Sequence, residues 1–212
     1  MGAHELLSSL GLREVHGDAL LSETFNEAVF ARLDVHQYNA RMDGKPFDMD
    51  EFVADATGYK STFMPYAEVA DMYIAGHYWA EGSPFLFTRD DMKRSTWKVQ
   101  VVADVSCDID GPVACTLRPS TIADPVYGYD PSTETECAYD APEGITVMAV
   151  DNLPCELPRD ASHGFGKEMM AHVIPLLVGG DRDDMLTNAT ETTLEGGLSP
   201  KFAYLQDYID QA

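Results

Sequence analysis

The strand expected over residues 146–150 ends in groups that could hold a ligand. Its residues have high β propensity, and Asp151 and Asn152 follow directly, ahead of two prolines and the start of a helix. A carboxylate and an amide at the end of a buried strand can accept and donate hydrogen bonds to a bound molecule. We therefore interpret this strand end as facing a ligand rather than solvent.

Three further strands are expected, over residues 30–35, 70–79 and 97–108. Each is apolar until it reaches polar residues near its end, which are Asp34, then His77 and Tyr78, then Asp104 and Asp108. In a parallel sheet, ligands bind in the crevice at the carboxyl ends of the strands. Four polar strand ends together predict a binding edge, while solvent exposure is the alternative at any single end.

Helical patterns alternate with these strands. Helices are expected over residues 3–10 (closed by Gly11), 48–56, 87–94 (capped by Thr88), 159–178 and 198–212 (capped by Ser199, with Pro200 at its first position). Residues 109–144 are rich in Gly, Pro, Thr and Asp, which predicts loops with short strands. The alternation predicts an α/β fold with a largely parallel sheet flanked by helices.

Bulk properties exclude several classes of protein. The 212 residues include 36 acidic and 14 basic side chains, so the net charge is −22 and there is no basic cluster. Such a surface repels phosphate backbones, and we expect no nucleic-acid partner. No apolar run approaches the roughly 20 residues that span a bilayer, and no secretory signal is seen, so we expect a cytoplasmic protein without a membrane partner.

The four cysteines lack metal-binding spacing. Cys107, Cys115, Cys137 and Cys155 form no CxxC pair and match no zinc ribbon or finger. We therefore expect free thiols and no metal site.

Several blocks of the sequence resemble one enzyme family. They occur in the family's order and cover nearly the whole chain: GAHELLSSLG (2–11), YAEVADMYIAGHYW (66–79), VQVVADVSCDIDGPV (99–113), CTLRPSTIADPVYGYD (115–130), ITVMAVDNLPCELPRDAS (145–162) and LSPKFAYLQDYI (198–209). The blocks resemble the saccharopine dehydrogenases and, more closely, the lysine–ketoglutarate reductase portion of bifunctional lysine-degrading enzymes. Alanine dehydrogenases look like more distant relatives.

The resemblance implies a Rossmann-like domain that binds a nicotinamide coenzyme. It implies that residues 1–212 form a single, incomplete domain including the C-terminal helix, without the family's first strand and Gly-rich turn, whose counterparts would precede Gly2. The family's substrate domain, with its acid–base lysine and histidine, has no counterpart in this sequence. His77 and His163 could titrate near neutrality, but neither matches the catalytic histidine, and we interpret both as structural or exposed.

Site residues follow from the same resemblance. The implied coenzyme contacts are Asp34 (adenosine ribose), Tyr78 (adenine–ribose side), Val105, Val150, Asp151, Asn152 and Leu153 (nicotinamide and its ribose), and Asp108 is the implied catalytic residue. The usual spacing from the glycine motif to the ribose carboxylate is about 20 residues, and Asp34 lies further along, which indicates an insertion over 12–29. A carboxylate there favours NAD, whereas the reductase branch commonly uses NADPH, so NAD and NADP both stay open.

The function that the resemblance implies is the interconversion of saccharopine with lysine and 2-oxoglutarate by hydride transfer. On this hypothesis the chain binds the dinucleotide, the amino-acid substrate binds in the full-length protein, and the chain alone has little or no turnover. One alternative is a non-catalytic truncated or split-gene interaction module that self-associates through exposed apolar surface. Another is a related amino-acid dehydrogenase with a different substrate.

Overall fold

The computed structural model describes residues 2–210, which divide into two compact units. The first unit runs to Leu153 and the second begins at Pro154. That residues 1–212 form a single domain stays a prediction.

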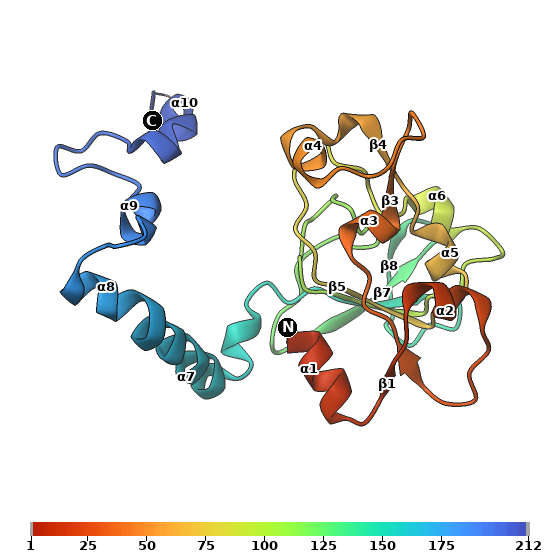
Figure 1. Ribbon diagram of the computed structural model, residues 1–212. Coiled ribbons are helices and arrows are strands. Elements are labelled where there is room, and N and C mark those ends of the chain that lie inside the picture. Colours follow the sequence, from red (N-terminus) through yellow and green to blue (C-terminus); the bar gives the residue numbers. More distant parts are fainter. Residues whose placement is uncertain (1, 211–212) are drawn as a thin grey trace. The chain divides into compact units, whose positions relative to one another are not determined.

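A five-stranded sheet forms the centre of the first unit (Figure 1). Its strands lie in the order β5 (Met72–Ala75), β6 (Val101–Asp104), β9 (Ile145–Met148), β7 (Val126–Asp130) and β8 (Thr135–Cys137). Strands β5, β6 and β9 are parallel, and β7 and β8 extend the sheet as an antiparallel pair. This mixed α/β arrangement, with helices around the sheet, confirms the Rossmann-like fold class and the short strands expected within residues 109–144.

Apolar residues explain why the parallel strands are central. Val102 of β6 and Val147 of β9 are fully buried, as expected for β-branched residues on a sheet covered by other elements. Aromatic side chains from the connecting segments complete the core, and the ring of Phe87 lies 5.9 Å from that of Phe63 and 4.9 Å from that of Trp97. Burying such rings is a main source of folding free energy.

The N-terminal part forms a small substructure of its own. It comprises α1 (Gly2–Ser9), β1 (Arg13–Glu14), α2 (Gly17–Ser22), β2 (Val29–Phe30) and α3 (Val35–Tyr38). Gly11 has φ +78°, and its N–H donates to the carbonyl of Ser8, so the expected glycine closure of the first helix is confirmed. Strands β1 and β2 pair in parallel in a separate two-stranded sheet.

The strand predicted over residues 30–35 is wrong. Strand β2 ends at Phe30, and Asp34 is the N-cap residue of α3 rather than the end of a strand in the main sheet. The reason is local: Gln37 stands at the third helical position, and its Oε1 accepts a hydrogen bond from the backbone N–H of Asp34 at 2.7 Å. This capping arrangement starts a helix at Val35, and residues 31–34 of the predicted strand form neither helix nor strand.

The remaining elements of the first unit are short. They are β3 (Asn39–Arg41), α4 (Met49–Ala54), a 3₁₀ turn (Ala56–Gly58), β4 (Tyr59–Ser61), α5 (Met64–Ala67) and α6 (Arg89–Met92). Thr88 caps α6, because its hydroxyl accepts a hydrogen bond from the N–H of Asp91 at 3.2 Å, as the sequence predicts.

The second unit consists of helical segments. They are α7 (Pro158–Glu168), a π-helical stretch (Met169–Val173), α8 (Ile174–Gly179), α9 (Met185–Ala189), a 3₁₀ stretch (Pro200–Leu205) and α10 (Gln206–Asp210), after a 3₁₀ turn at Leu153–Cys155. The helix expected over 159–178 is thus interrupted just before Pro175, which lacks the N–H that a regular turn requires.

The C-terminal helix differs from its prediction in two ways. Its first part is 3₁₀ rather than α, with Pro200 at the expected first position, and residues 211–212 of the predicted helix lie outside the described residues. Ser199 stands at the N-cap position, but its hydroxyl donates to the carbonyl of Thr190 instead of capping the helix.

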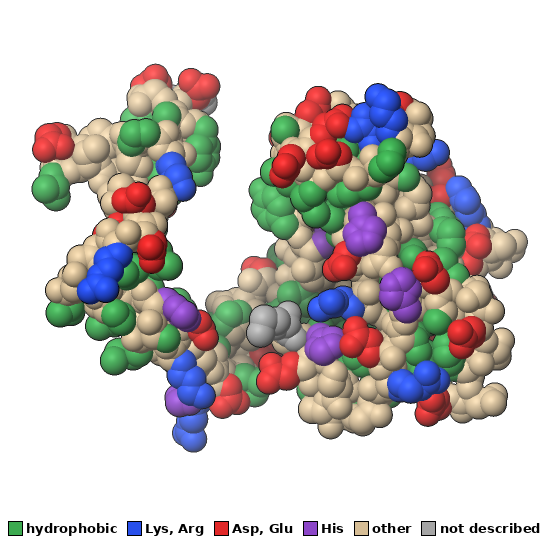
Figure 2. Space-filling view, viewed as in Figure 1, with side chains coloured by type: hydrophobic (Ala, Val, Ile, Leu, Met, Phe, Trp, Pro, Cys, Tyr) green, Lys and Arg blue, Asp and Glu red, His purple; other side chains and the backbone are tan. Residues whose placement is uncertain are grey.

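The surface is acidic. Asp and Glu side chains are scattered over the face shown in Figure 2 rather than gathered in one patch. Within residues 2–210, no helix has the length and apolar character needed to cross a membrane.

Candidate functional site

The parallel strands place three of the predicted polar ends at one edge of the sheet. Ala75 of β5 pairs with Asp104 of β6, and Ala103 of β6 pairs with Met148 of β9. The register therefore brings the segments after β5, β6 and β9 to the same carboxyl-terminal edge, where α/β sheets bind ligands. We call this edge, with the turns 104–108 and 149–152, the strand-end site.

Asp104 is the best-connected side chain of the strand-end site. It is fully buried, and its Oδ1 accepts hydrogen bonds from the N–H and hydroxyl of Ser106 (3.1 and 2.5 Å) and the N–H of Cys107 (3.1 Å). Its Oδ2 accepts from the hydroxyl of Thr116 at 2.6 Å. Because both carboxylate oxygens already accept hydrogen bonds within the protein, Asp104 shapes the turn and leaves ligand contacts to its neighbours. Sequence reasoning noted Asp104 only as a strand end, although a carboxylate two residues before a serine is a signal for such a turn.

Asp108 lies in the tight turn that follows. Its carbonyl accepts the N–H of Gly111 at 3.0 Å, and its side chain is half-buried. A Cβ on Gly111 would lie 2.6 Å from the Cβ of Asp108, so only glycine fits there. Asp108, Ile109, Asp110 and Gly111 therefore form a tight turn, and the half-exposed carboxylate of Asp108 stays open to a ligand. Val105, at the start of the turn, is 43% exposed.

The turn after β9 combines buried and exposed residues. Val150 is buried, Asp151 and Asn152 are exposed, and Leu153 is half-buried. The thiol of Cys107 donates to the carbonyl of Ala149 at 3.1 Å, which links this turn to the one after β6. The exposed carboxylate and amide thus follow a backbone segment that is tied to the turn after β6, and their contact with a ligand stays a prediction.

After β5, the two polar residues behave differently. Tyr78 is 92% exposed, so its side chain lies in solvent. His77 is half-buried, with its Nδ1 3.4 Å from the hydroxyl oxygen of Tyr73 and its buried Nε2 without a partner among the described residues. Burial lowers the pKa of His77, while Asp104 and Asp108 act in the opposite direction. A lowered pKa keeps the imidazole neutral at pH 7.

Asp34 lies apart from the main sheet. It lines a cavity of 330 Å³ together with five other residues: His16, Asp18, His36, Gln37 and Tyr66. The parallel strands β1 and β2 place Asp18 and Asp34 around this space, because both residues follow shortly after a strand end. Gly17 is packed closely here, since a Cβ on it would lie 2.8 Å from Cδ2 of Leu33. We call this cavity the two-aspartate cavity.

Asp18 is a residue that sequence reasoning missed. It follows β1, the strand directly after α1, by four residues, just as Asp34 follows β2 by four residues. Both carboxylates therefore stand shortly after a strand, which is where a ribose-binding carboxylate lies in dinucleotide-binding folds. The signal was weak because β1 is only two residues long and its burial pattern is fully exposed.

The cysteines and acidic groups form no metal centre within residues 2–210. No group of three His, Cys, Asp or Glu side chains gathers there in a way that could hold a metal ion. All four cysteines carry free thiols.

These features define a Rossmann-like α/β unit whose parallel strands end in polar turns. No family model matches the chain. The chain is similar to the mitochondrial alpha-aminoadipic semialdehyde synthase of Mus musculus, with 25% identity over 222 residues, which is 92% of this chain and 23% of the mouse enzyme. The corresponding enzyme of Arabidopsis thaliana is 29% identical over 58% of this chain and 12% of its own length.

A second group of relatives is named for its reaction and coenzyme. The saccharopine dehydrogenase [NAD(+), L-lysine-forming] of Schizosaccharomyces pombe is 26% identical over 114 residues, which is 53% of this chain and 30% of the yeast enzyme. The comparisons confirm the resemblance that the sequence blocks indicated. The chain spans less than a third of the length of each of these relatives.

Proposed function

We propose that this chain is the dinucleotide-binding portion of an oxidoreductase that interconverts saccharopine with lysine and 2-oxoglutarate. The observation that carries the proposal is the register of β5, β6 and β9, which gathers the residues matching the family's nicotinamide contacts at one edge. The similarity to enzymes named saccharopine dehydrogenase supports the choice of reaction.

In the proposed reaction, the secondary amine of saccharopine loses a hydride and a proton and becomes an imine. Water then hydrolyses the imine to lysine and 2-oxoglutarate. When bound, a nicotinamide coenzyme supplies the hydride acceptor. The chain's own task is to hold the reacting ring in a fixed position, because hydride transfer depends on the alignment of the two carbons.

The turns of the strand-end site offer suitable groups for the nicotinamide end. Asp151 can accept hydrogen bonds from ribose hydroxyls, and Asn152 can both donate to and accept from the carboxamide. Val105 offers exposed apolar surface to the ring, while Val150 is buried and can contribute through its backbone. Asp108 lies in the neighbouring turn, where the resemblance puts the reacting centre, and the strong acid–base residues are expected outside this chain.

The two-aspartate cavity offers groups for the adenosine ribose. Asp18 and Asp34 can accept hydrogen bonds from the 2′ and 3′ hydroxyls. A coenzyme with a 2′-phosphate would bring about two negative charges towards both carboxylates, which is unfavourable. We therefore favour NAD(H) over NADP(H). The pyrophosphate needs donors other than these acidic groups, and the glycine turn of the family would supply them.

The proposal is tested by titrating the 212-residue chain with NADH and NADPH by calorimetry and by assaying saccharopine oxidation. We expect NADH to bind more tightly than NADPH and turnover to be little or none. Robust saccharopine oxidation by this chain would contradict the proposal that the main acid–base residues lie outside it. Absence of NADH binding would contradict the proposal that the chain binds the coenzyme. A substrate panel on the full-length protein then separates saccharopine from other amino acids.

A further inference from the structure

We propose that Thr116 and Ser120 form a brace that sets the spacing between the two turns of the strand-end site. One turn follows β6 and the other follows β9, and no direct strand pairing joins them beyond Met148. The identity of the ligand rests on the proposed function, whereas the brace itself is a set of contacts within the first unit. Arg118 lies between Thr116 and Ser120 in the sequence.

Thr116 holds the turn after β6. It is 1% exposed, and its hydroxyl donates to Oδ2 of the fully buried Asp104 at 2.6 Å. The other oxygen of Asp104 accepts only from Ser106 and Cys107, so Thr116 is the single described partner of Oδ2. Removing that donor would leave a buried carboxylate oxygen unsatisfied, which costs more than an ordinary hydrogen bond.

Ser120 holds the turn after β9. Its N–H donates to the carbonyl of Ala149 at 2.8 Å, and its hydroxyl oxygen accepts the N–H of Ala149 at 3.0 Å. The same hydroxyl donates to the carbonyl of Pro125 at 2.8 Å, so its direction is fixed. Ser120 is 1% exposed and forms a parallel bridge with Val150, which prolongs the sheet beside the end of β9.

A third contact shows that the two turns meet. The thiol of Cys107, in the turn after β6, donates to the same Ala149 carbonyl that Ser120 binds. The peptide group of Ala149 is therefore tied to the first turn through Cys107 and to the brace through Ser120. Asp151 and Asn152 follow only two and three residues later.

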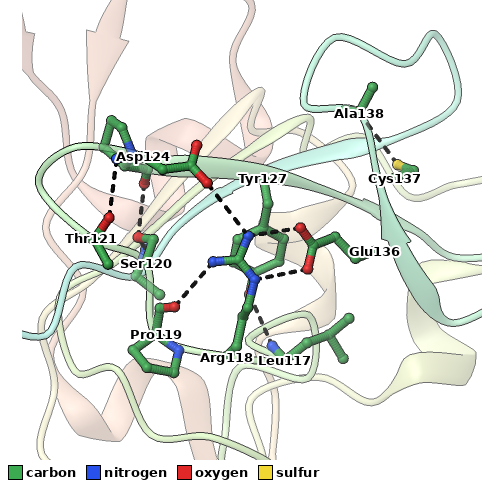
Figure 3. A network of polar contacts seen from close by, with 12 residues as sticks. Leu117, Arg118, Pro119, Ser120, Thr121, Asp124, Tyr127, Glu136, Cys137 and Ala138 are labelled. Atoms are coloured by element: carbon green, nitrogen blue, oxygen red, sulfur yellow. Dashed lines mark hydrogen bonds and ion pairs between the residues drawn. The ribbon is translucent and has the colours of Figure 1, made fainter.

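Arg118 anchors the brace to the β7–β8 hairpin (Figure 3). Its Nε and Nη2 donate to the two carboxylate oxygens of Glu136 at 2.8 and 2.7 Å, and its guanidinium lies 4.7 Å from the ring centre of Tyr127. The hydroxyl of Tyr127 in turn accepts the N–H of Leu117 at 2.9 Å. A bidentate ion pair and a stacked ring hold a segment more firmly than a single contact can.

The brace should matter for one end of the coenzyme only. It contacts the turns assigned to the nicotinamide, while the residues assigned to the adenosine ribose line the two-aspartate cavity. Loosening either turn should therefore weaken the binding of NADH more than the binding of ADP-ribose, which lacks the nicotinamide. A role confined to overall stability would change neither affinity once the chain is folded.

The test compares Thr116→Val and Ser120→Ala with the native 212-residue chain by calorimetry, well below the unfolding temperature of each. We expect NADH affinity to fall about tenfold in either variant, because Thr116→Val removes one buried hydrogen bond and Ser120→Ala removes two, with ADP-ribose affinity unchanged. Thr116→Ser keeps the hydroxyl and should restore NADH affinity. Ser132→Ala is the matched control, because its hydroxyl bonds only to Asp130 in the exposed β7–β8 turn.

Amide hydrogen exchange gives a readout that needs no ligand. Protection at residues 105–108 and 149–152 should fall in the variants, while Val102 and Val147 in the sheet keep theirs. Unchanged exchange in both turns, or equal losses of NADH and ADP-ribose affinity, would overturn the brace. If the native chain binds neither ligand, the proposed function fails and the exchange data alone decide the brace. If Ser120→Ala does not fold, the Thr116→Val and Thr116→Ser pair decides it.

Discussion

The hydroxyl oxygen of Tyr73 lies 3.4 Å from Nδ1 of His77, where two half-buried side chains meet at the carboxyl end of β5. Burial lowers the pKa of His77 below its ordinary value, against the opposing effect of Asp104 and Asp108. Below about pH 6.5, His77 therefore binds a proton more readily in the unfolded chain than in the folded chain. The contribution of His77 to stability is complete above that pH and declines as the pH falls.

Replacing this histidine should flatten the acid side of the stability profile. We expect the urea midpoint of His77→Gln to fall less between pH 7 and pH 5.5 than that of the native chain. Equal slopes for the native chain and His77→Gln would show that the burial of His77 has no effect on proton binding.

The four thiols should react in an order set by burial. Burial raises the pKa of Cys115 to about 12, and it also raises the pKa of the half-buried Cys107 and Cys137, whereas Cys155 is exposed. At pH 8 a thiol with a pKa near 12 is about one part in 10⁴ thiolate, and thiolate is the reactive form. Iodoacetamide labelling followed by mass spectrometry should show Cys155 first and Cys115 last. Labelling of Cys115 as fast as Cys155 in the native chain would contradict the burial of its thiol.

Gly128 in β7 leaves no room for a side chain. A Cβ there would lie 2.2 Å from the carbonyl oxygen of Ala138 and 2.7 Å from Sγ of Cys137. We expect Gly128→Ala to lower the free energy of unfolding by about 2–4 kcal/mol, since strand and neighbouring loop must separate. Gly58→Ala, at a glycine with open space around it, should cost less than about 1 kcal/mol. Chemical denaturation of both variants measures the difference.

Asp151 and Asn152 should carry affinity for the nicotinamide end of the coenzyme. We expect Asp151→Ala and Asn152→Ala each to weaken NADH binding about tenfold and to leave ADP-ribose binding unchanged, because ADP-ribose lacks the nicotinamide. Both side chains are exposed, so neither substitution should disturb folding. Asp140→Ala, in another exposed turn, is the matched control for charge. Native NADH affinity in both site variants would remove these residues from the coenzyme site.

Asp18 and Asp34 should set the preference between the two coenzymes. Both carboxylates line one cavity, so Asp18→Asn and Asp34→Asn each remove a charge that would repel a 2′-phosphate. We expect each substitution to narrow the ratio of NADPH to NADH dissociation constants by about tenfold, measured by calorimetry. If only Asp34→Asn changes this ratio, Asp34 is the residue that binds the adenosine ribose. If only Asp18→Asn changes it, Asp18 is that residue.

Local patterns in the sequence account for much of the fold. The apolar runs predicted β5, β6 and β9, the polar residues after them lie at one edge of the sheet, and Thr88 and Gly11 marked helix boundaries. These features depend on neighbours a few residues away, so the chain order alone reveals them. The same local reasoning misplaced a strand at Asp34, because the apolar residues after Phe30 lie in a connecting segment that leads into the capped helix α3.

Other features depend on residues that are distant in sequence. Thr116 meets Asp104 across 12 positions, Ser120 meets Ala149 across 29, and Cys107 meets Ala149 across 42. No periodicity or spacing specifies such contacts, since they arise only when parallel strands align and the connecting loop folds back over their ends. The sequence by itself determined the strand-end residues that could touch a ligand. Only the tertiary structure decided that Asp104 is used up within the fold, that Asp18 joins Asp34, and that one brace ties two turns together.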